Sequence, residues 1–365
     1  MNPLENLIRE TIAENGPMSL DTYMTLALAH PVHGYYASNM PLGEGGDFIT
    51  APEISQMFGE LIGLWCVAVW RAMGEPRPFL LVELGPGRGS LMADALRAAK
   101  IAPDFVGALD LHLVEASELL QRCQRAALKE SQAAARWHKT ADELPSGPAI
   151  IVANEFFDCL PVRHFVRGKD GWHERLVGLD DKGRLCFGLA PDAESGRSAP
   201  GEPGQVIEVG HSAAVLMTRL AARIAAQGGA LLVIDYGYDT PAGGETLQAV
   251  KQHRFADPLR DPGEADLTAH VDFCGLAHAA RAAGARVHGP VPQGEWLARL
   301  GIHERAAQLR RNAGERQRAA IDAALLRLAG RGQNSAATDM ARLFKALAAT
   351  GQSLGVLPGF ETASP

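Results

Sequence analysis

Apolar and polar residues along the middle of the chain follow the pattern of strands that alternate with helices. Short apolar runs at 80–84, 109–114 and 149–153 predict three strands. The first two are followed by segments with helical spacing, at 90–99 and 119–128. Strands that alternate with helices in this way indicate an α/β domain built on a mostly parallel sheet.

A change of period interrupts this alternation. Between 163 and 210 the pattern becomes that of short strands, at 172–178 and 184–189, which predicts an inserted β-hairpin region. A helix at 213–226 and a strand at 230–234 then resume the α/β pattern.

The two flanks of this core are predicted to be helical. Residues 4–29 form two short amphipathic helices in this interpretation, with a break at Gly16-Pro17 and Ser19 as the second N-cap. Beyond 295, apolar residues again recur at helical spacing. The outer face of that tail is rich in arginine and is expected to be solvated, with protein docking as the alternative (Arg305, Arg310, Arg311, Arg316 and Arg318). The predicted organisation is an N-terminal helical segment, an α/β core with its insertion, and a helical C-terminal extension (1–75, 76–295 and 296–365).

Two loops are expected to serve the ligand site. Residues 239–269 carry several prolines and glycines and little regular pattern, which predicts a long lid or binding loop. A glycine-rich loop at 42–49, with Asp47 in it, precedes Thr50 and Glu53. The S/T-x-x-E spacing of Thr50 and Glu53, with Pro52 between them, predicts a capping box for a long apolar helix. A ligand site at that helix start is the second interpretation.

Composition narrows the class of protein. The 365 residues are 47% hydrophobic and 21% charged, as in ordinary globular enzymes, and the formal net charge of −7 argues against a nucleic-acid partner. The five cysteines are scattered and the twelve histidines dispersed, so neither a disulfide framework nor a metal site is predicted. The most apolar stretch, 61–70, is too short to span a membrane, and no signal peptide is recognisable. We therefore expect a cytoplasmic protein without direct membrane insertion.

The turn after the first strand carries the clearest motif. Glu83 lies near the end of the strand, and Gly85, Gly87 and Gly89 follow before the helix. Such a turn presents backbone N–H groups to a nucleotide-like ligand, although a glycine-rich turn without a ligand is an alternative. The third glycine comes one residue too early for a dinucleotide fingerprint, with Ser90 in its place, which disfavours a nicotinamide-dependent oxidoreductase. The spacing resembles motif I of the methyltransferases that depend on S-adenosyl-L-methionine (SAM).

Polar residues follow the other predicted strands at the same end. Glu115 comes after the second strand, where an acid can bind ribose hydroxyls; an N-cap or first-turn acid of the next helix is the alternative. Asn154, Glu155 and Asp158 follow the third strand, and Asp235 follows the strand at 230–234. Because ligands bind at the carboxyl ends of parallel strands, these side chains are candidates for one crevice.

Four blocks together identify a family resemblance. The blocks are 46–55, the Glu83–Gly89 turn, 154–162 and 263–273, in this order. They resemble the MidA-like methyltransferases, whose mitochondrial members are assembly factors for respiratory complex I, over about residues 1–350. The resemblance implies a Rossmann-like core with a mostly parallel seven-stranded sheet, SAM as cofactor and a protein substrate. In the mitochondrial members the reaction is symmetric dimethylation of an arginine in a core complex I subunit.

The resemblance also implies roles for residues. Glu83 and the three glycines of the turn would form the SAM loop, Glu115 would hold the ribose, and Thr50 and Glu53 are further cofactor-binding candidates. Asn154 and Glu155 occupy the place that holds the methyl-accepting nitrogen, and Cys159 stands where the block has alanine.

A guanidinium carries a permanent charge, so acids must orient it and accept its proton. Glu155, with Asp158 or Asp235, is the predicted clamp. The competing interpretations are a SAM-binding assembly chaperone with little catalysis and a small-molecule methyltransferase. The sequence leaves the acceptor, the degree of methylation and the oligomeric state open.

Overall fold

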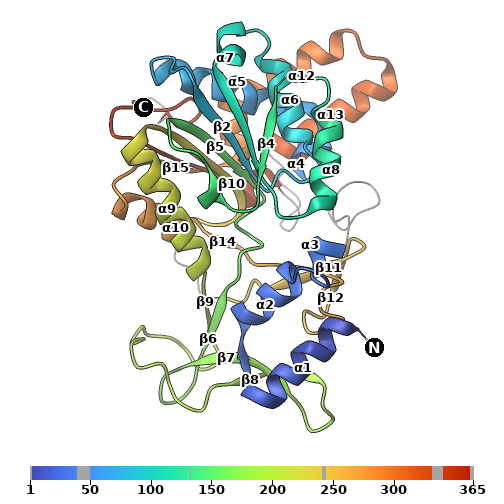
Figure 1. The fold of residues 1–365 in the computed structure, drawn as a ribbon, viewed down its shortest axis with the longest axis vertical. Helices are drawn as coiled ribbons and strands as arrows, with labels where there is room; N and C mark the ends of the chain where they lie inside the picture. The colour runs from blue at the N-terminus through green and yellow to red at the C-terminus, as the bar shows by residue number, and fades with distance from the viewer. Residues whose placement is uncertain (1, 39–49, 132, 241–243, 331–339, 362–365) are drawn as a thin grey trace. The chain divides into compact units, whose positions relative to one another are not determined.

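The computed structural model describes residues 2–38, 50–131, 133–240, 244–330 and 340–361 (Figure 1). The chain divides into two compact units, each assembled from segments distant in sequence. The smaller unit comprises Met1–Phe48, Asp158–Val215 and Thr240–Asp272. The larger unit comprises Ile49–Phe157, Leu216–Asp239 and Phe273–Pro365. The domain boundaries expected from the sequence, which divide the chain into 1–75, 76–295 and 296–365, stay a prediction.

The larger unit is built on a mostly parallel sheet. Seven of its strands follow one another in the order β15-β16-β10-β5-β2-β3-β4. Their bounds are Arg286–Pro292, Phe344–Thr350, Gly229–Tyr238, Ala149–Asn154, Phe79–Leu84, Leu109–Val114 and Ala135–His138. Only β16 runs against its neighbours in this series, because its pairs with β10 and β15 are antiparallel and the other pairs are parallel. The predicted fold class is confirmed.

Burial explains why the central strands read as continuous apolar runs. Every side chain of β2 and β5 is buried, as expected where helices cover both faces of a parallel sheet. Among the helices of this unit are α4 to α8 (Ala51–Ile54, Gln56–Ala72, Ser90–Ala99, Pro103–Ala108 and Glu118–Ala127), most of α9 (His211–Gln227), and α10 (Phe273–Ala282). The helices α5 and α6 approach closely at Gly63, where an added Cβ would lie 2.3 Å from the carbonyl oxygen of Ala95.

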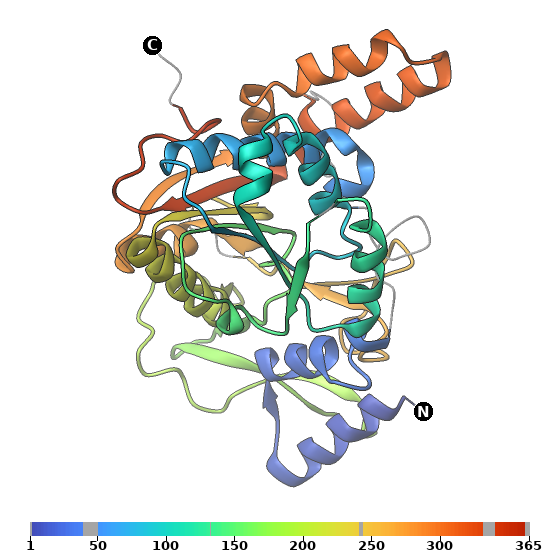
Figure 2. The same ribbon diagram turned by 45° about the horizontal axis from the view of Figure 1, so that its top comes forward.

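The C-terminal extension corrects one expectation. Its described residues include the helices α11 to α14 (Gln293–Arg299, Ile302–Arg311, Glu315–Ala329 and Met340–Leu343), and Figures 1 and 2 show α12 and α13 side by side. The extension does not stay helical, however, because β16 follows and takes an interior place in the sheet. Its sequence, FKALAAT, is rich in alanine, so its strand state is set by the neighbours β10 and β15 and not by propensity.

The smaller unit contains the predicted N-terminal helices and the insertion. Helices α1, α2 and α3 span Pro3–Asn15, Leu20–Ala29 and Tyr35–Ser38. A five-stranded sheet has the order β1-β7-β6-β9, with β8 paired to β7 (Met18–Ser19, Trp172–Leu179, Arg163–Arg167, Val206–Val209 and Leu185–Leu189). The two predicted strands of the insertion correspond to β7 and β8 and are confirmed. Ser19 occupies the N-cap position of α2, but its side chain makes no capping bond there.

The expectation of a long irregular loop at 239–269 is wrong. Within the described part of this stretch, β11, β12 and β13 form a three-stranded sheet (Gln248–Lys251, Arg254–Ala256 and Asp266–Thr268). The strands are three or four residues long, too short for their alternation to stand out in the sequence. Across the described ranges of both units, no helix has the length and apolar character needed to cross a membrane.

Candidate active site

The glycine turn between β2 and α6 adopts backbone angles that favour glycine. Gly85, Gly87 and Gly89 have φ values of 60°, 55° and 87°. A Cβ on Gly85 would lie 2.7 Å from the ring of Phe156, and one on Gly89 would lie 3.2 Å from the Cα of Gln124. The turn is therefore packed between the segment that follows β5 and helix α8.

Glu83, next to this turn, is a buried acid with an unsatisfied oxygen. Its residue is 3% exposed, and within the described ranges its Oε2 has no hydrogen-bond partner. Burial raises the pKa of Glu83 to about 8 from the usual 4.5, because the charged form is poorly solvated. A buried acceptor without a donor needs an explanation, and a ligand with a donor group supplies one.

Glu115 lies at the end of β3, beside the same turn. Its Oε1 accepts the Ser117 N–H at 2.8 Å, and its Oε2 accepts from Gln124 Nε2 at 3.2 Å. Burial raises the pKa of Glu115, and these hydrogen bonds oppose that shift. Ser117 is the N-cap of α8 and Glu118 is the acid of its first turn, so Glu115 precedes the helix and does not have the capping or first-turn role of its alternative interpretation.

The segment after β5 brings Asn154 and Glu155 to the sheet edge next to the turn. Asn154 donates to Glu155 Oε1 at 3.2 Å, and the same oxygen accepts the Ala51 N–H of α4 at 3.0 Å. Glu155 has a φ of 48°, an uncommon value for a residue other than glycine. Asn154 Oδ1 is buried and has no hydrogen-bond partner among the described residues. The site thus presents a carboxylate and a buried amide oxygen side by side.

Asp235 supports this segment from the neighbouring strand β10. It is completely buried, and its carboxylate accepts the N–H groups of Phe156 at 3.1 Å, Phe157 at 2.9 Å and Tyr236 at 2.9 Å. These contacts fix the backbone that follows Glu155.

Thr50 and Glu53 do not form the predicted capping box. Thr50 occupies the N-cap position of the short helix α4, but its side chain makes no capping bond. Glu53 instead accepts the Ser90 hydroxyl at 2.5 Å and lies 3.9 Å from Arg88, so it contacts the motif I segment. Ser55 caps the long helix α5 by accepting the Met57 N–H at 3.2 Å. The glycine-rich loop at 42–49 with Asp47 lies outside the described residues.

Asp158 belongs to the smaller unit. It is buried, and its carbonyl accepts the Ala269 N–H at 2.9 Å. Nearby, the Tyr36 hydroxyl donates to Asp266 at 3.0 Å, and burial, followed by the negative charge of Asp266, raises the pKa of Tyr36. Asn154, Glu155 and Asp235 therefore lie together in the larger unit, whereas Asp158 belongs to the smaller unit.

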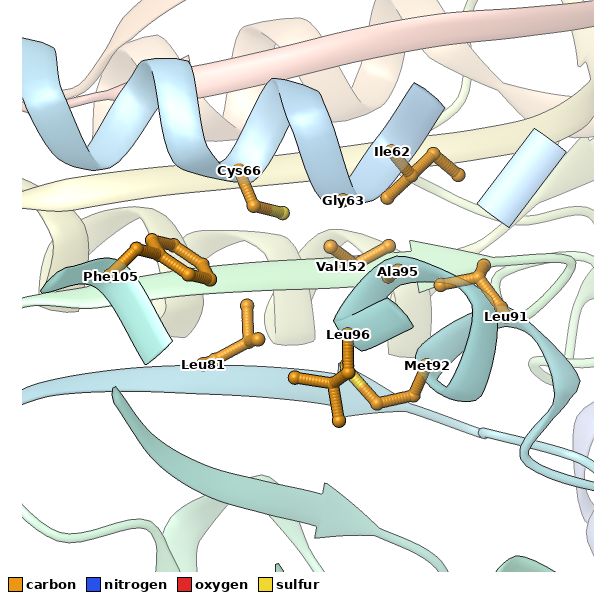
Figure 3. Close-up of a pocket in the computed structure, with 10 residues that line it drawn as sticks. All are labelled: Ile62, Gly63, Cys66, Leu81, Leu91, Met92, Ala95, Leu96, Phe105 and Val152. Atoms are coloured by element: carbon orange, nitrogen blue, oxygen red, sulfur yellow. The ribbon is translucent and has the colours of Figure 1, made fainter. Parts of the chain in front are cut away.

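An apolar cavity of about 10 Å³ lies between α5, α6 and the sheet (Figure 3). The side chains in Figure 3 that line it are hydrocarbon or sulfur groups, among them Cys66, Leu81 and Met92. It has room for about one water but no polar partner to hold it, so it is a packing void of the core and not a ligand site.

Gln124 contacts this site, although no pattern in the sequence points to it. It sits in a helix with an ordinary amphipathic pattern, and glutamine is common on helix surfaces. Only the folded chain shows that it is completely buried against the turn.

The fold and the turn together define a class. A seven-strand order with one antiparallel strand next to the edge, and a glycine turn after the interior strand β2, form a Rossmann-like methyltransferase core. Glu83, with its unsatisfied oxygen, the glycine turn and Glu115 fit a cofactor with an adenosine moiety and donor groups.

Comparisons with known proteins agree with this class. Residues 61–291 match a family model described as S-adenosyl-L-methionine-dependent methyltransferase. The chain is 40% identical over 330 residues to the protein arginine methyltransferase NDUFAF7, mitochondrial, of Danio rerio, covering 83% of this chain and 77% of that protein. The Homo sapiens protein of the same name is 38% identical over 333 residues, which are 83% of this chain and 75% of the relative. A Burkholderia thailandensis crystal structure with bound S-adenosyl-homocysteine has a TM-score of 0.86 at 27% identity, and covers 99% of this chain and 95% of its own.

The chain belongs to this family of SAM-dependent methyltransferases. It is an enzyme of that class, and SAM is its cofactor.

Proposed function

We propose that the chain is a protein arginine N-methyltransferase that acts on a subunit of respiratory complex I during assembly. The names of the relatives support an arginine acceptor in a protein. The proposal includes a cytoplasmic location for the enzyme, where a newly made subunit is accessible to it.

The observation that carries the arginine acceptor is the pair of groups at the end of β5. Asn154 Oδ1 is buried without a donor in the described chain, and the Glu155 carboxylate lies beside it. Both groups are hydrogen-bond acceptors. A guanidinium has five N–H donors and no acceptor, so it matches this pair better than a hydroxyl or a carboxylate does.

The remaining site residues divide between the cofactor and the backbone. In this proposal Glu83, the three motif I glycines and Glu115 bind SAM. Thr50 and Glu53 are proposed to shape the near wall of the cofactor site, since Glu53 contacts Ser90 directly after the glycine turn. Asp235 is proposed to position Glu155 through the backbone of Phe156 and Phe157.

The chemistry required of these residues is mainly electrostatic. When bound, SAM supplies a methyl group on a positively charged sulfur. The acceptor nitrogen forms a bond to that carbon as the carbon–sulfur bond breaks, and the nitrogen then loses one proton. In this proposal Glu155 orients the guanidinium and accepts that proton, and Asn154 holds a second N–H. Asp158 is a further candidate for the clamp.

The test measures transfer of labelled methyl groups to an arginine-containing protein substrate. We expect Glu155→Ala and Glu155→Gln to lower the transfer rate about 100-fold or more, because a general base typically contributes 10²–10⁴-fold. Binding of S-adenosyl-homocysteine should stay within about threefold of the wild type. Glu130→Gln, an exposed acid outside the site, is the matched control. Methylation by Glu155→Ala at the wild-type rate would refute the assignment.

The complex I acceptor needs its own experiment. Complex I isolated from cells with and without an active copy of this chain is digested and its methylated arginines are mapped by mass spectrometry. The proposal expects one arginine of a core subunit to lose its methyl groups in the cells without activity. An unchanged pattern would remove complex I as the target while leaving the enzyme class intact.

One observation favours a second function, that of an assembly chaperone. Arg311 and Arg316 are exposed and, within the described ranges, make no hydrogen bond or ion pair, and Leu326 on the same helical pair is 65% exposed. These groups would suit an acidic segment of a partner protein. A variant that cannot bind SAM but still binds the partner and supports assembly would favour the chaperone. Methylation of free guanidino compounds at the rate of the protein substrate would favour a small-molecule methyltransferase.

A further inference from the structure

Gln124 is buried in a way that is unusual for a glutamine in the middle of a surface helix. It lies in α8, and its exposed fraction is 0%. Its amide makes three hydrogen bonds: Nε2 donates to the Gly87 carbonyl at 2.8 Å and to Glu115 Oε2 at 3.2 Å, and Oε1 accepts from Trp137 Nε1 at 2.8 Å. It therefore bridges the motif I turn and the acid after β3.

The orientation of this amide is fixed by chemistry. The indole nitrogen of Trp137 can only donate, so the oxygen of the Gln124 amide must face it. The NH₂ group is then directed at the two acceptors, and both of its N–H bonds are used. Trp137 is in turn held on β4, where the Arg125 guanidinium lies 3.8 Å from the centre of its ring.

Each contact fixes a group that the cofactor site needs. The Gly87 carbonyl lies in the turn, where φ is 55° and the backbone has alternatives. The Glu115 carboxylate is buried and depends on hydrogen-bond donors to stay charged. Close packing supports the same arrangement, because an added Cβ on Gly89 would lie 3.5 Å from Cγ of Gln124.

We propose that Gln124 is a positioning residue for SAM, which holds the Gly87 backbone and the Glu115 carboxylate in the geometry that binds the adenosine moiety. The inference rests on the proposed ribose role of Glu115. It adds a residue of α8 and its Trp137 partner on β4 to a site otherwise built from strand ends and turns.

The first test measures binding of S-adenosyl-homocysteine to the full chain by calorimetry. Gln124→Met keeps the length and volume of the side chain and removes the two donors together with the oxygen that accepts from Trp137. We expect about 10- to 100-fold weaker binding, the effect of losing hydrogen bonds to a buried carboxylate and carbonyl. The matched control is Gln121→Met on the same helix, since among the described residues the Gln121 amide donates to the backbone carbonyl of Glu115 alone, at 2.9 Å. It should bind within twofold of the wild type.

The second readout is the pH dependence of that affinity, which a merely structural role would not move. The groups that stabilise the charged Glu115 are the N–H groups of Ser117 and Ala116 and the Gln124 amide, none of them ionisable. The nearby titratable side chain on β4 is that of His138, whose carbonyl accepts the Glu115 N–H. Loss of the Gln124 donor raises the pKa of Glu115 further, so the fall in affinity at low pH should begin at higher pH in Gln124→Met than in the wild type.

The outcomes separate this inference from the proposals beneath it. Wild-type affinity in Gln124→Met, or a lowered melting temperature with an unmoved pH profile, would overturn the positioning role. Wild-type affinity in Glu115→Gln would overturn the ribose role on which it rests, and the positioning role with it. Failure to methylate arginine concerns the acceptor alone, since no acceptor is present in the binding assay. If Gln124→Met does not fold, Gln124→Glu retains an acceptor for Trp137, lacks the donors, and should show at least the same loss.

Discussion

The two halves of the candidate site differ in how completely their polar groups are satisfied. On the β3 side, defined by Glu115 and Gln124, each carboxylate and amide group has a protein partner. On the β2–β5 side, defined by Glu83, Asn154 and Glu155, the described chain leaves two buried acceptor atoms without a donor, Glu83 Oε2 and Asn154 Oδ1. The strands β2 and β5 are neighbours in the sheet, where Glu83 is paired with Val152.

This difference indicates a division of labour. Unsatisfied buried acceptors cost stability, and folded proteins rarely keep them unless a ligand or water completes them. In the proposed function, the β3 side is already organised for the adenosine moiety before any ligand arrives. In the same proposal, donor groups of the ligands complete the β2–β5 side, and the methyl group meets its acceptor there.

The largest expected effect tests the unsatisfied acid directly. The pKa of Glu83 is raised to about 8 from 4.5, so the ligand-free folded state holds a proton that the unfolded chain releases. Stability from this group is complete below pH 4.5 and is lost as the pH rises through about 8. We expect Glu83→Gln to remove that loss, so that its unfolding free energy exceeds the wild-type value by about 3–5 kcal/mol more at pH 8.5 than at pH 5.

Urea unfolding of both proteins without ligand at the two pH values measures this. Glu130→Gln, which replaces an exposed acid, is the control and should show no such pH dependence. Parallel pH curves for Glu83→Gln and the wild type would mean that Glu83 is charged in the free protein and has a donor.

The pattern of apolar and polar residues in the sequence predicted the part of the fold that contains the strands β2, β3 and β5. The strands β2, β3 and β5 consist mainly of apolar residues and are bounded by turn residues, so their bounds were predictable within one residue. The strand β16 could not be predicted in this way, because its alanine-rich sequence favours a helix. It forms a strand because β10 and β15 supply hydrogen-bond partners on both sides.

The candidate site residues differ in the same way in how far the sequence predicts them. The sequence placed Glu115 and Asn154 at strand ends, and those placements need only the alternation of strands and turns. The contact of Glu53 with Ser90 and the burial of Gln124 depend on how helices pack, which no local pattern records.

The next largest effect is expected for a substitution at Gly85, which lies between the β3 side and the β2–β5 side of the candidate site. Gly85 has a φ of 60°, and a Cβ there would lie 2.7 Å from the Phe156 ring, so Gly85→Ala should displace both the turn and the segment after β5. We expect about 100-fold weaker binding of S-adenosyl-homocysteine and a stability loss of about 2–4 kcal/mol, from overpacking and backbone strain together. Gly74→Ala is the control: its φ is 83° but nothing lies within 4 Å of the added Cβ, so only about 1 kcal/mol should be lost and binding should be unchanged. Equal effects of the two substitutions would show that the Phe156 contact is unimportant.

An ion network away from the site should affect stability without affecting binding. Glu60 on α5 is 3% exposed and accepts from Arg305 of α12 at 2.7 and 2.9 Å and from Arg97 of α6 at 2.6 Å. Arg305 thus anchors α12 and is not part of a purely solvated face. Arg305→Ala should cost about 1–3 kcal/mol, because it leaves a buried carboxylate with one partner fewer.

The same network predicts a pH trend opposite to that of Glu83. Burial raises the pKa of Glu60, but the hydrogen bonds and charges of Arg305 and Arg97 outweigh it and lower the pKa. Its stability contribution is present above the unfolded pKa and is lost as the pH falls. Arg310→Ala, at an exposed pair with Asp322, is the control and should cost less than about 1 kcal/mol. A change of more than twofold in S-adenosyl-homocysteine affinity on Arg305→Ala would mean that α12 contributes to the site.

The smallest effect is expected where a residue departs from the family block. Cys159 is half-buried and interacts with the Tyr36 hydroxyl, which also donates to Asp266 at 3.0 Å. In Cys159→Ala the hydroxyl keeps its stronger, charged partner, so we expect less than about 1 kcal/mol of lost stability and methyl transfer within twofold of the wild type. Asp266→Asn, which weakens that partner, should cost more in the same unfolding measurement. If Cys159→Ala instead lowered methyl transfer as far as Glu155→Ala, the thiol would have to act on the acceptor, and the β2–β5 side could no longer be explained by its unsatisfied oxygens alone.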